Sequence, residues 1–147
     1  MNELKQKPDN LKEALTEQIL NLKPAPELPA DAVPFQELYL DGTEPDNTRW
    51  RALLGAYLAK AKTFEIHCWN EEAQWIALAL KHGVLKEDDW QYGKIITGAV
   101  TLEFREMLLN LPKPADRELC NKMTPFFQIF LDEAFQSCHY GTENYYR

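Results

Sequence analysis

Residues 64–75, FEIHCWNEEAQW, bring together the side chains of this sequence that could most readily do chemistry. Glu65, His67 and Cys68 lie within four positions, and Glu71 and Glu72 follow closely. Carboxylate, imidazole and thiolate groups are the ligands of zinc and the working parts of acid–base and nucleophilic sites. The stretch therefore forms either such a site or a strand that leads into a helix.

The spacing from Phe64 to Trp69 favours a strand. Apolar and polar residues alternate with a period of two, which is typical of a strand with one face buried. The adjacent residues His67 and Cys68 then point to opposite faces and cannot form a nucleophile–base pair by themselves. Glu65 and His67 share a face and are the only members of the stretch left without a structural explanation.

The residues after this strand are typical of a helix start. Asn70 predicts an N-cap, and Glu71 and Glu72 fall in the first turn, where the positive end of the helix dipole favours acids. Gly83 predicts the end of the helix. Because the segment between them is apolar on most sides, we expect it to be the most enclosed helix of the fold.

Metal binding and catalysis have little support in the sequence. Zinc needs three or four converging ligands, usually at tight spacing, whereas Cys138 and His139 lie about 70 residues from Glu65 and His67. Nucleotide-binding, nucleophile-elbow and zinc-protease motifs are all missing from the sequence. We therefore predict no catalytic residue, no metal and no cofactor, and we keep a small enzyme with a pocket near Glu65 and His67 as an alternative.

Length and composition indicate one globular domain. The 147 residues are 45% hydrophobic and 27% charged, which suffices for a core and argues against general disorder. We expect no transmembrane helix and no secretory signal, because no long apolar run is present. Cys68, Cys120 and Cys138 are odd in number and widely spaced, which favours free thiols and a cytoplasmic location.

The pattern of elements predicts an α+β fold, a predominantly helical single domain with a small antiparallel sheet. Its strands are expected near 64–69 and 94–100. Helices are expected after EPDNT (44–48), where apolar residues recur from Trp50 to Ala61 at helical spacing, and after Thr101. The domain 1–147 divides into an N-terminal helix over 1–22, a proline-rich strap over 23–34 and a main body over 35–147.

Two segments of the main body are harder to assign. FQELYLDG (35–42) alternates poorly, so we predict a turn or a short helix. Residues 125–138 follow Thr124-Pro125, a good helix start, yet Phe127, Ile129 and Leu131 also alternate as in a hairpin. We predict a helix there and leave the hairpin open.

The charge distribution points to a protein partner. The net charge is −7, which disfavours nucleic acid and anionic membranes as partners and suits a basic protein. Between Pro24 and Thr48 there are six acids and no Lys or Arg. Trp90 follows three acids, and tyrosines gather in HYGTENYYR, a composition typical of interface anchors.

We therefore predict an acidic protein-binding protein, an inhibitor or immunity protein that blocks a basic toxin or nuclease. The alternatives are the small enzyme and a regulatory or structural module that self-associates as a homo-oligomer. The expected contact residues are acids and aromatics: Glu27, Asp31, Asp41, Glu44, Asp46, Glu87, Asp88, Asp89, Trp90, Tyr140, Tyr145 and Tyr146.

Overall fold

The computed structural model describes residues 33–41, 43–115 and 122–147. Several predictions concern parts of the chain outside these residues: the helix over 1–22, the strap up to residue 32, Glu27, Asp31 and Cys120. Val33–Arg147 form one compact unit. None of the helices that the described ranges contain is long and apolar enough to cross a membrane.

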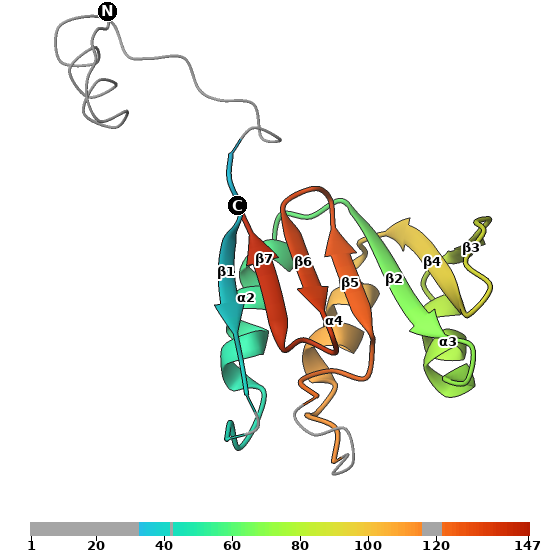
Figure 1. Cartoon of the computed structure of the whole chain (residues 1–147). Helices are drawn as coiled ribbons and strands as arrows, with labels where there is room; N and C mark the ends of the chain where they lie inside the picture. The colour runs from blue at the N-terminus through green and yellow to red at the C-terminus, as the bar shows by residue number, and fades with distance from the viewer. Residues whose placement is uncertain (1–32, 42, 116–121) are drawn as a thin grey trace, which may run out of the picture. The chain divides into compact units, whose positions relative to one another are not determined.

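Seven antiparallel strands form a single sheet in the described part of the chain (Figure 1). Their order across the sheet is β1-β7-β6-β5-β2-β4-β3, so the first described strand lies beside the last. The strands are β1 (Gln36–Tyr39), β2 (Thr63–Trp69), β3 (Val84–Lys86), β4 (Gly93–Ala99), β5 (Gln128–Leu131), β6 (Phe135–Cys138) and β7 (Glu143–Tyr146).

Three helices pack on one face of this sheet. They are α2 (Thr48–Leu58), α3 (Ala73–Leu80) and α4 (Leu102–Asn110). In Figure 1, α2 and α4 lie behind the strands, and no described helix covers the face turned toward the viewer. We call the two sides the helix face and the open face.

The core fills the space between the helix face and the helices. Alternate strand residues such as Ile66, Ile96 and Ile129 are fully buried there, and Trp50 and Phe104 meet them from α2 and α4. Burial of such side chains stabilises the unit by about 1.5–3 kcal/mol each. The other half of each strand's residues is left on the open face.

The predicted fold class was wrong in its proportions. Strands hold 31% and helices 26% of the described residues, so the domain is a seven-stranded antiparallel sheet with three short helices rather than a mainly helical fold with a small sheet. The two predicted strands do exist as β2 and β4, and they pair antiparallel. Five further strands of three or four residues were missed or assigned otherwise.

The largest error concerns residues 125–138, which form the β5–β6 hairpin and not a helix. Ile129 and Leu131 are buried on the helix face, while Phe130 lies half-buried on the open face. Since both faces of β5 carry apolar residues, the segment looks apolar all round, as a buried helix would. Asp132 makes the turn with a left-handed φ of 50°.

Two smaller predictions were also wrong. FQELYLDG contains β1, not a turn or helix. The helix predicted to be the most enclosed, α3, has Ala79 as its one fully buried residue, and Leu80 is 38% exposed. An apolar composition therefore did not mean a central position.

Two predictions based on local signals were confirmed. In α2, Trp50, Leu54 and Leu58 are buried along one stripe. The Thr101 side chain caps α4 by accepting a hydrogen bond of 3.0 Å from the Phe104 N–H.

Candidate protein-binding face

The strand register assigns two rows of residues to the open face. Each row crosses all seven strands, because side chains of paired residues lie on the same face. One row is Glu37, Tyr145, Gln136, Phe130, Glu65, Thr97 and Val84. The other is Tyr39, Glu143, Cys138, Gln128, His67, Ile95 and Lys86.

Aromatic rings form a continuous line that begins on the open face with residues of β5 and β2 and ends in the turn after β6. Along this line the ring centroids of successive partners lie 4.8–5.8 Å apart, within the range of favourable aromatic contact. All six side chains are half-buried, so each keeps part of its surface exposed. We call this line the aromatic row: Phe130, His67, Trp90, Trp69, Phe127 and Tyr140.

Trp90 is held in the aromatic row by a glycine. It precedes β4 and folds back over Gly93, where a Cβ would collide with the Trp90 ring and with the Cys68 carbonyl oxygen. The carboxylate of Asp88 accepts a hydrogen bond from the Trp90 N–H. The ring of Trp90 thus lies against His67, although the three residues before it in the loop are exposed.

Glu65 and His67 form a hydrogen-bonded pair at one side of the row. His67 Nε2 lies 2.6 Å from Glu65 Oε2, and Lys86 Nζ lies 3.3 Å from Glu65 Oε1. Partial burial alone would raise the pKa of Glu65, but hydrogen bonds from His67 and Lys86 outweigh it and hold this pKa below its usual value. The carboxylate is therefore ionised at neutral pH.

Glu72 anchors the other end of the row. The prediction that Glu71 and Glu72 lie in the first turn of the helix was wrong, because α3 begins at Ala73. The Glu72 carboxylate accepts hydrogen bonds from the Trp69 N–H at 2.9 Å and from the Tyr140 hydroxyl at 2.7 Å. Burial and the bond to Glu72 raise the pKa of Tyr140, which keeps its hydroxyl protonated as a donor. Asn70, predicted as the helix cap, instead donates to the Gln91 carbonyl oxygen and so joins α3's start to the β3–β4 loop.

Tyr140 lies in an unusual backbone turn. His139 and Tyr140 have left-handed φ values of 50° and 60°, which side chains of this size rarely adopt. Hydrogen bonds fix the turn, since the Tyr140 N–H donates to Phe127 O at 2.9 Å and the Met123 N–H donates to Tyr140 O at 2.7 Å. The strained turn places the Tyr140 ring against Phe127 at the end of the row.

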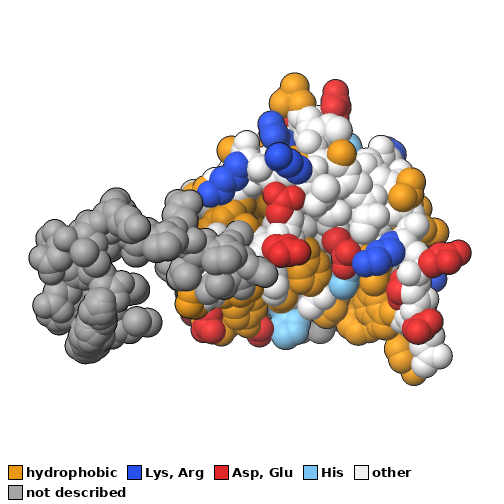
Figure 2. Space-filling view, turned by 90° about the horizontal axis from the view of Figure 1, so that it is seen from above, with side chains coloured by type: hydrophobic (Ala, Val, Ile, Leu, Met, Phe, Trp, Pro, Cys, Tyr) orange, Lys and Arg blue, Asp and Glu red, His pale blue; other side chains and the backbone are white. Residues whose placement is uncertain are grey.

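The acids before Trp90 border the aromatic row. Glu87, Asp88 and Asp89 are all exposed in the β3–β4 loop. We call these three residues the acid loop. In the space-filling view from above, in which the open face is not turned toward the viewer, acidic side chains lie at the centre and the top as well as along the lower and right-hand margins (Figure 2).

The remaining predicted contacts fall elsewhere. Asp41, Glu44 and Asp46 lie in the β1–α2 loop at the opposite end of the strand order from the acid loop. They are used locally: Asp41 accepts from Thr43, Asp46 accepts from the Thr48 N–H, and Glu44 pairs with Arg49 at 2.7 Å.

The two C-terminal tyrosines point to opposite faces. Tyr145 lies on the open face, with its ring edge-on to Tyr39 at 6.3 Å. Tyr146 lies on the helix face, with its ring 6.0 Å from Tyr57. Of the predicted residues, the structure thus brings together Trp90, Tyr140 and the acid loop.

Sequence reasoning missed four members of the aromatic row as contacts: Phe130, His67, Trp69 and Phe127. The alternation that includes His67 and Trp69 in β2 was visible, but their contacts with Phe127 and Phe130 depend on how β2 and β5 align. Among the described residues no three His, Cys, Asp or Glu side chains gather as metal ligands.

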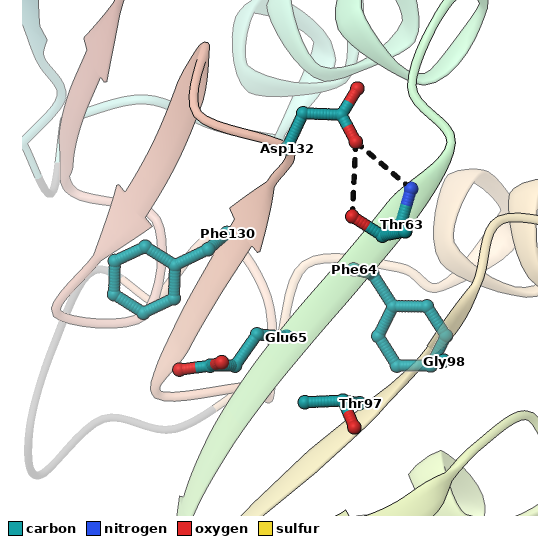
Figure 3. Close-up of a pocket in the computed structure, with 7 residues that line it drawn as sticks. All are labelled: Thr63, Phe64, Glu65, Thr97, Gly98, Phe130 and Asp132. Carbon is teal, nitrogen blue, oxygen red and sulfur yellow. Dashed lines mark hydrogen bonds between the residues drawn. The ribbon is translucent and has the colours of Figure 1, made fainter. Parts of the chain in front are cut away.

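A hollow of about 530 Å³ opens on this face beside Glu65. Figure 3 shows its walls, which come from β2, β4, β5 and the turn after β5. Asp132 accepts hydrogen bonds from the Thr63 N–H at 2.9 Å and the Thr63 hydroxyl at 3.0 Å. The lining residues are Thr63, Phe64, Glu65, Thr97, Gly98, Phe130 and Asp132.

Comparison with known proteins gave no relative. No protein-family model matches the sequence, and neither the search of curated proteins nor that of solved structures found a significant match.

Proposed function

We propose that this protein binds a basic protein partner through the open face and the acid loop. The observation that supports this proposal best is the aromatic row, which begins on the sheet face that no described helix covers (Figure 1) and is bordered by acids. Half-buried aromatic side chains supply contact area with little loss of side-chain freedom.

Charge gives such a face its selectivity. The acid loop holds three exposed carboxylates, and Glu37 and Glu143 lie on the far side of the same face. Opposite charge on a partner accelerates encounter, and like charge excludes wrong partners. A rim of acids around aromatic anchors therefore suits a basic surface.

The role that we propose is inhibition. A cytoplasmic inhibitor or immunity protein must capture a basic toxin or nuclease quickly and cover its site, and carboxylates can take the place of substrate phosphates there. The thiols of Cys68 and Cys138 are free, as a protein in a reducing compartment would keep them.

A salt-dependent capture experiment tests this proposal. Tagged protein is incubated with extract of its host and washed at low and high salt, and the recovered basic protein is purified for rate measurements. We expect the double substitution Glu87→Ser with Asp89→Ser to slow association and to flatten its salt dependence. Asp88 is not substituted in this variant, because its carboxylate accepts the hydrogen bond from the Trp90 N–H.

The matched control removes the same charge from the helix face. Glu103 and Glu106 are exposed acids of α4, so Glu103→Ser with Glu106→Ser should leave the association rate close to that of the unmodified protein. If both double substitutions slowed association equally, the rate would depend on the net charge of the protein and not on the acids of the open face. Full enzymatic activity of the captured partner in the complex would refute inhibition.

The pair of Glu65 and His67 supports a second candidate, a small enzyme. Its hydrogen bond of 2.6 Å at the border of the hollow is the geometry of a carboxylate that orients an imidazole base. That hypothesis requires His67→Ala to abolish an activity without unfolding the protein. Self-association remains a third hypothesis, and mass measurement in solution tests it.

A further inference from the structure

The hollow beside Glu65 offers the proposed partner a site for a cation. We propose that it receives the guanidinium group of an arginine side chain of that partner. This inference rests on the proposed function, because it names one contact of the same open face. Three features of the hollow support it: its acids, its aromatic ring and its openness.

The two acids of the hollow are ionised, and Asp132 has acceptor capacity left. Burial would raise the pKa of Asp132, but hydrogen bonds from Thr63 and Lys62 outweigh it and lower this pKa. Most of these bonds go to Oδ1, whereas Oδ2 accepts one bond among the described residues, of 3.2 Å from the Lys62 N–H. A carboxylate has about four acceptor positions, so Oδ2 can accept a donor from a ligand.

Phe130 supplies the aromatic wall. In Figure 3 its ring turns its face toward the viewer, on the open side of the sheet, and Glu65 extends from β2 toward it. Glu65 and Phe130 are paired across β2 and β5, so the carboxylate and the ring are neighbours. A guanidinium group stacks on an aromatic face and donates to carboxylates at the same time, which an ammonium group does less well.

Two lysines lie at the border of the hollow, and their positive charges partly offset the negative charges of its acids. Lys86 contacts Glu65 at 3.3 Å, and Lys62 helps to lower the pKa of Asp132. None of the seven lining residues is itself basic. The lysines weaken general attraction of cations, so binding depends on stacking and on directed hydrogen bonds, which favours arginine over simple ions.

The hollow is an open depression and not an enclosed cavity, although its volume is in the range of ligand sites. An open site holds a free small molecule weakly, because much of the ligand stays in water. A side chain that a partner protein delivers does not need an enclosed site, since the rest of the interface holds it in place.

Titration with an arginine derivative tests the inference. Amide resonances of the protein are followed while N-acetylarginine methylamide is added, with the uncharged isostere N-acetylcitrulline methylamide as control. We expect saturable shifts at Thr63, Glu65, Thr97 and Asp132 with millimolar affinity, and about tenfold weaker binding of the citrulline compound.

Two variants make the test specific to the hollow. Phe130→Ala removes the stacking surface and should weaken arginine binding about threefold or more. Thr97→Lys places an ammonium group of the protein itself in the hollow and should abolish the shifts. The acid-loop variant Glu87→Ser with Asp89→Ser should leave them unchanged, because neither residue lines the hollow.

The outcomes separate this inference from the proposed function. If the arginine compound does not shift these residues while the basic partner still binds, the inference is refuted and the proposed function stands. If spermidine binds far more tightly than the arginine compound, the hollow serves a small polyamine and the partner side chain is the wrong occupant. If the arginine compound binds as expected but no basic partner is captured, the cation site stands and the proposed function fails.

Discussion

The substitution Gly93→Ala is expected to displace Trp90 and so to disturb both stability and the candidate face. Gly93 lies at the start of β4, opposite Trp69 of β2. A Cβ at this position would lie far inside van der Waals contact with the Cys68 carbonyl oxygen and with two ring carbons of Trp90. The backbone contact means that rotating Trp90 away cannot relieve the whole clash.

The cost follows from two physical effects. Overpacking of a tight site typically costs about 1–3 kcal/mol. Trp90 also loses its edge-on contact with Trp69, at 5.1 Å between ring centroids, and such aromatic pairs contribute about 0.5–1.5 kcal/mol. We therefore expect a loss of about 2–3 kcal/mol in the free energy of unfolding, or roughly 8–12 °C in Tm for a unit of this size.

Urea unfolding monitored by tryptophan fluorescence measures this effect. The emission of Gly93→Ala should shift to the red, because Trp90 becomes more exposed. Gly55→Ala is the matched control: Gly55 lies within α2, its Cβ would meet Leu109 at a comfortable 3.8 Å, and alanine favours helix by about 0.5–1 kcal/mol. Unchanged stability and fluorescence in Gly93→Ala would refute the placement of Trp90 over this glycine.

Three further predictions concern single interactions. Trp50→Phe removes the buried 3.2 Å hydrogen bond from the indole N–H to the Ser137 hydroxyl and should cost about 1–3 kcal/mol in urea unfolding, whereas a neutral effect would contradict that bond. Asp132 has a lowered pKa, so its contribution to stability is present above its unfolded pKa of about 3.8 and is lost as pH falls through the folded pKa. The stability difference between the unmodified protein and Asp132→Asn should therefore shrink from pH 7 to pH 3, and a constant difference would show that the hydrogen bonds to Thr63 do not depend on the charge. Burial and, to a smaller degree, Glu72 raise the pKa of Cys68 to about 12, and the side chain is fully buried, so thiol labelling at this residue at pH 8, mapped by mass spectrometry, should be much slower in the native than in the unfolded protein. Rapid native labelling would contradict its burial.

Local signals in the sequence identified the elements that carry one clear pattern. The alternation in β2, the apolar stripe of α2 and the Thr101 cap each depend on residues near one another in the chain, so they were visible without the fold. β5 carries two conflicting signals, since Thr124-Pro125 is typical of a helix start and Phe130 makes the second face apolar. In the structure Thr124 and Pro125 are buried instead of beginning a helix.

The candidate face was only partly predictable for a similar reason. The composition around Trp90 indicated an aromatic anchor among acids, and the structure places both at the border of the open face. The contact between His67 and Phe130, however, depends on the alignment of β2 with β5, which no single local pattern specifies. The hydrogen bond between Tyr140 and Glu72 was not predictable from a local pattern either, because the two residues lie 68 positions apart in the chain.

The order of the strands has a consequence for synthesis of the chain. Leu38 of β1 pairs with Asn144 of β7, which is 106 residues later in the chain. β2 likewise cannot complete its pairing before β5 has been synthesised. β7 lies between β1 and β6 in the finished sheet. Until β7 has left the ribosome, β1 has no partner strand and one edge of β6 stays unpaired. Pairings over such distances are slow to form, and strand edges that stay unpaired during this wait promote association between chains. We therefore expect the nascent protein to depend on chaperones until translation has passed β7.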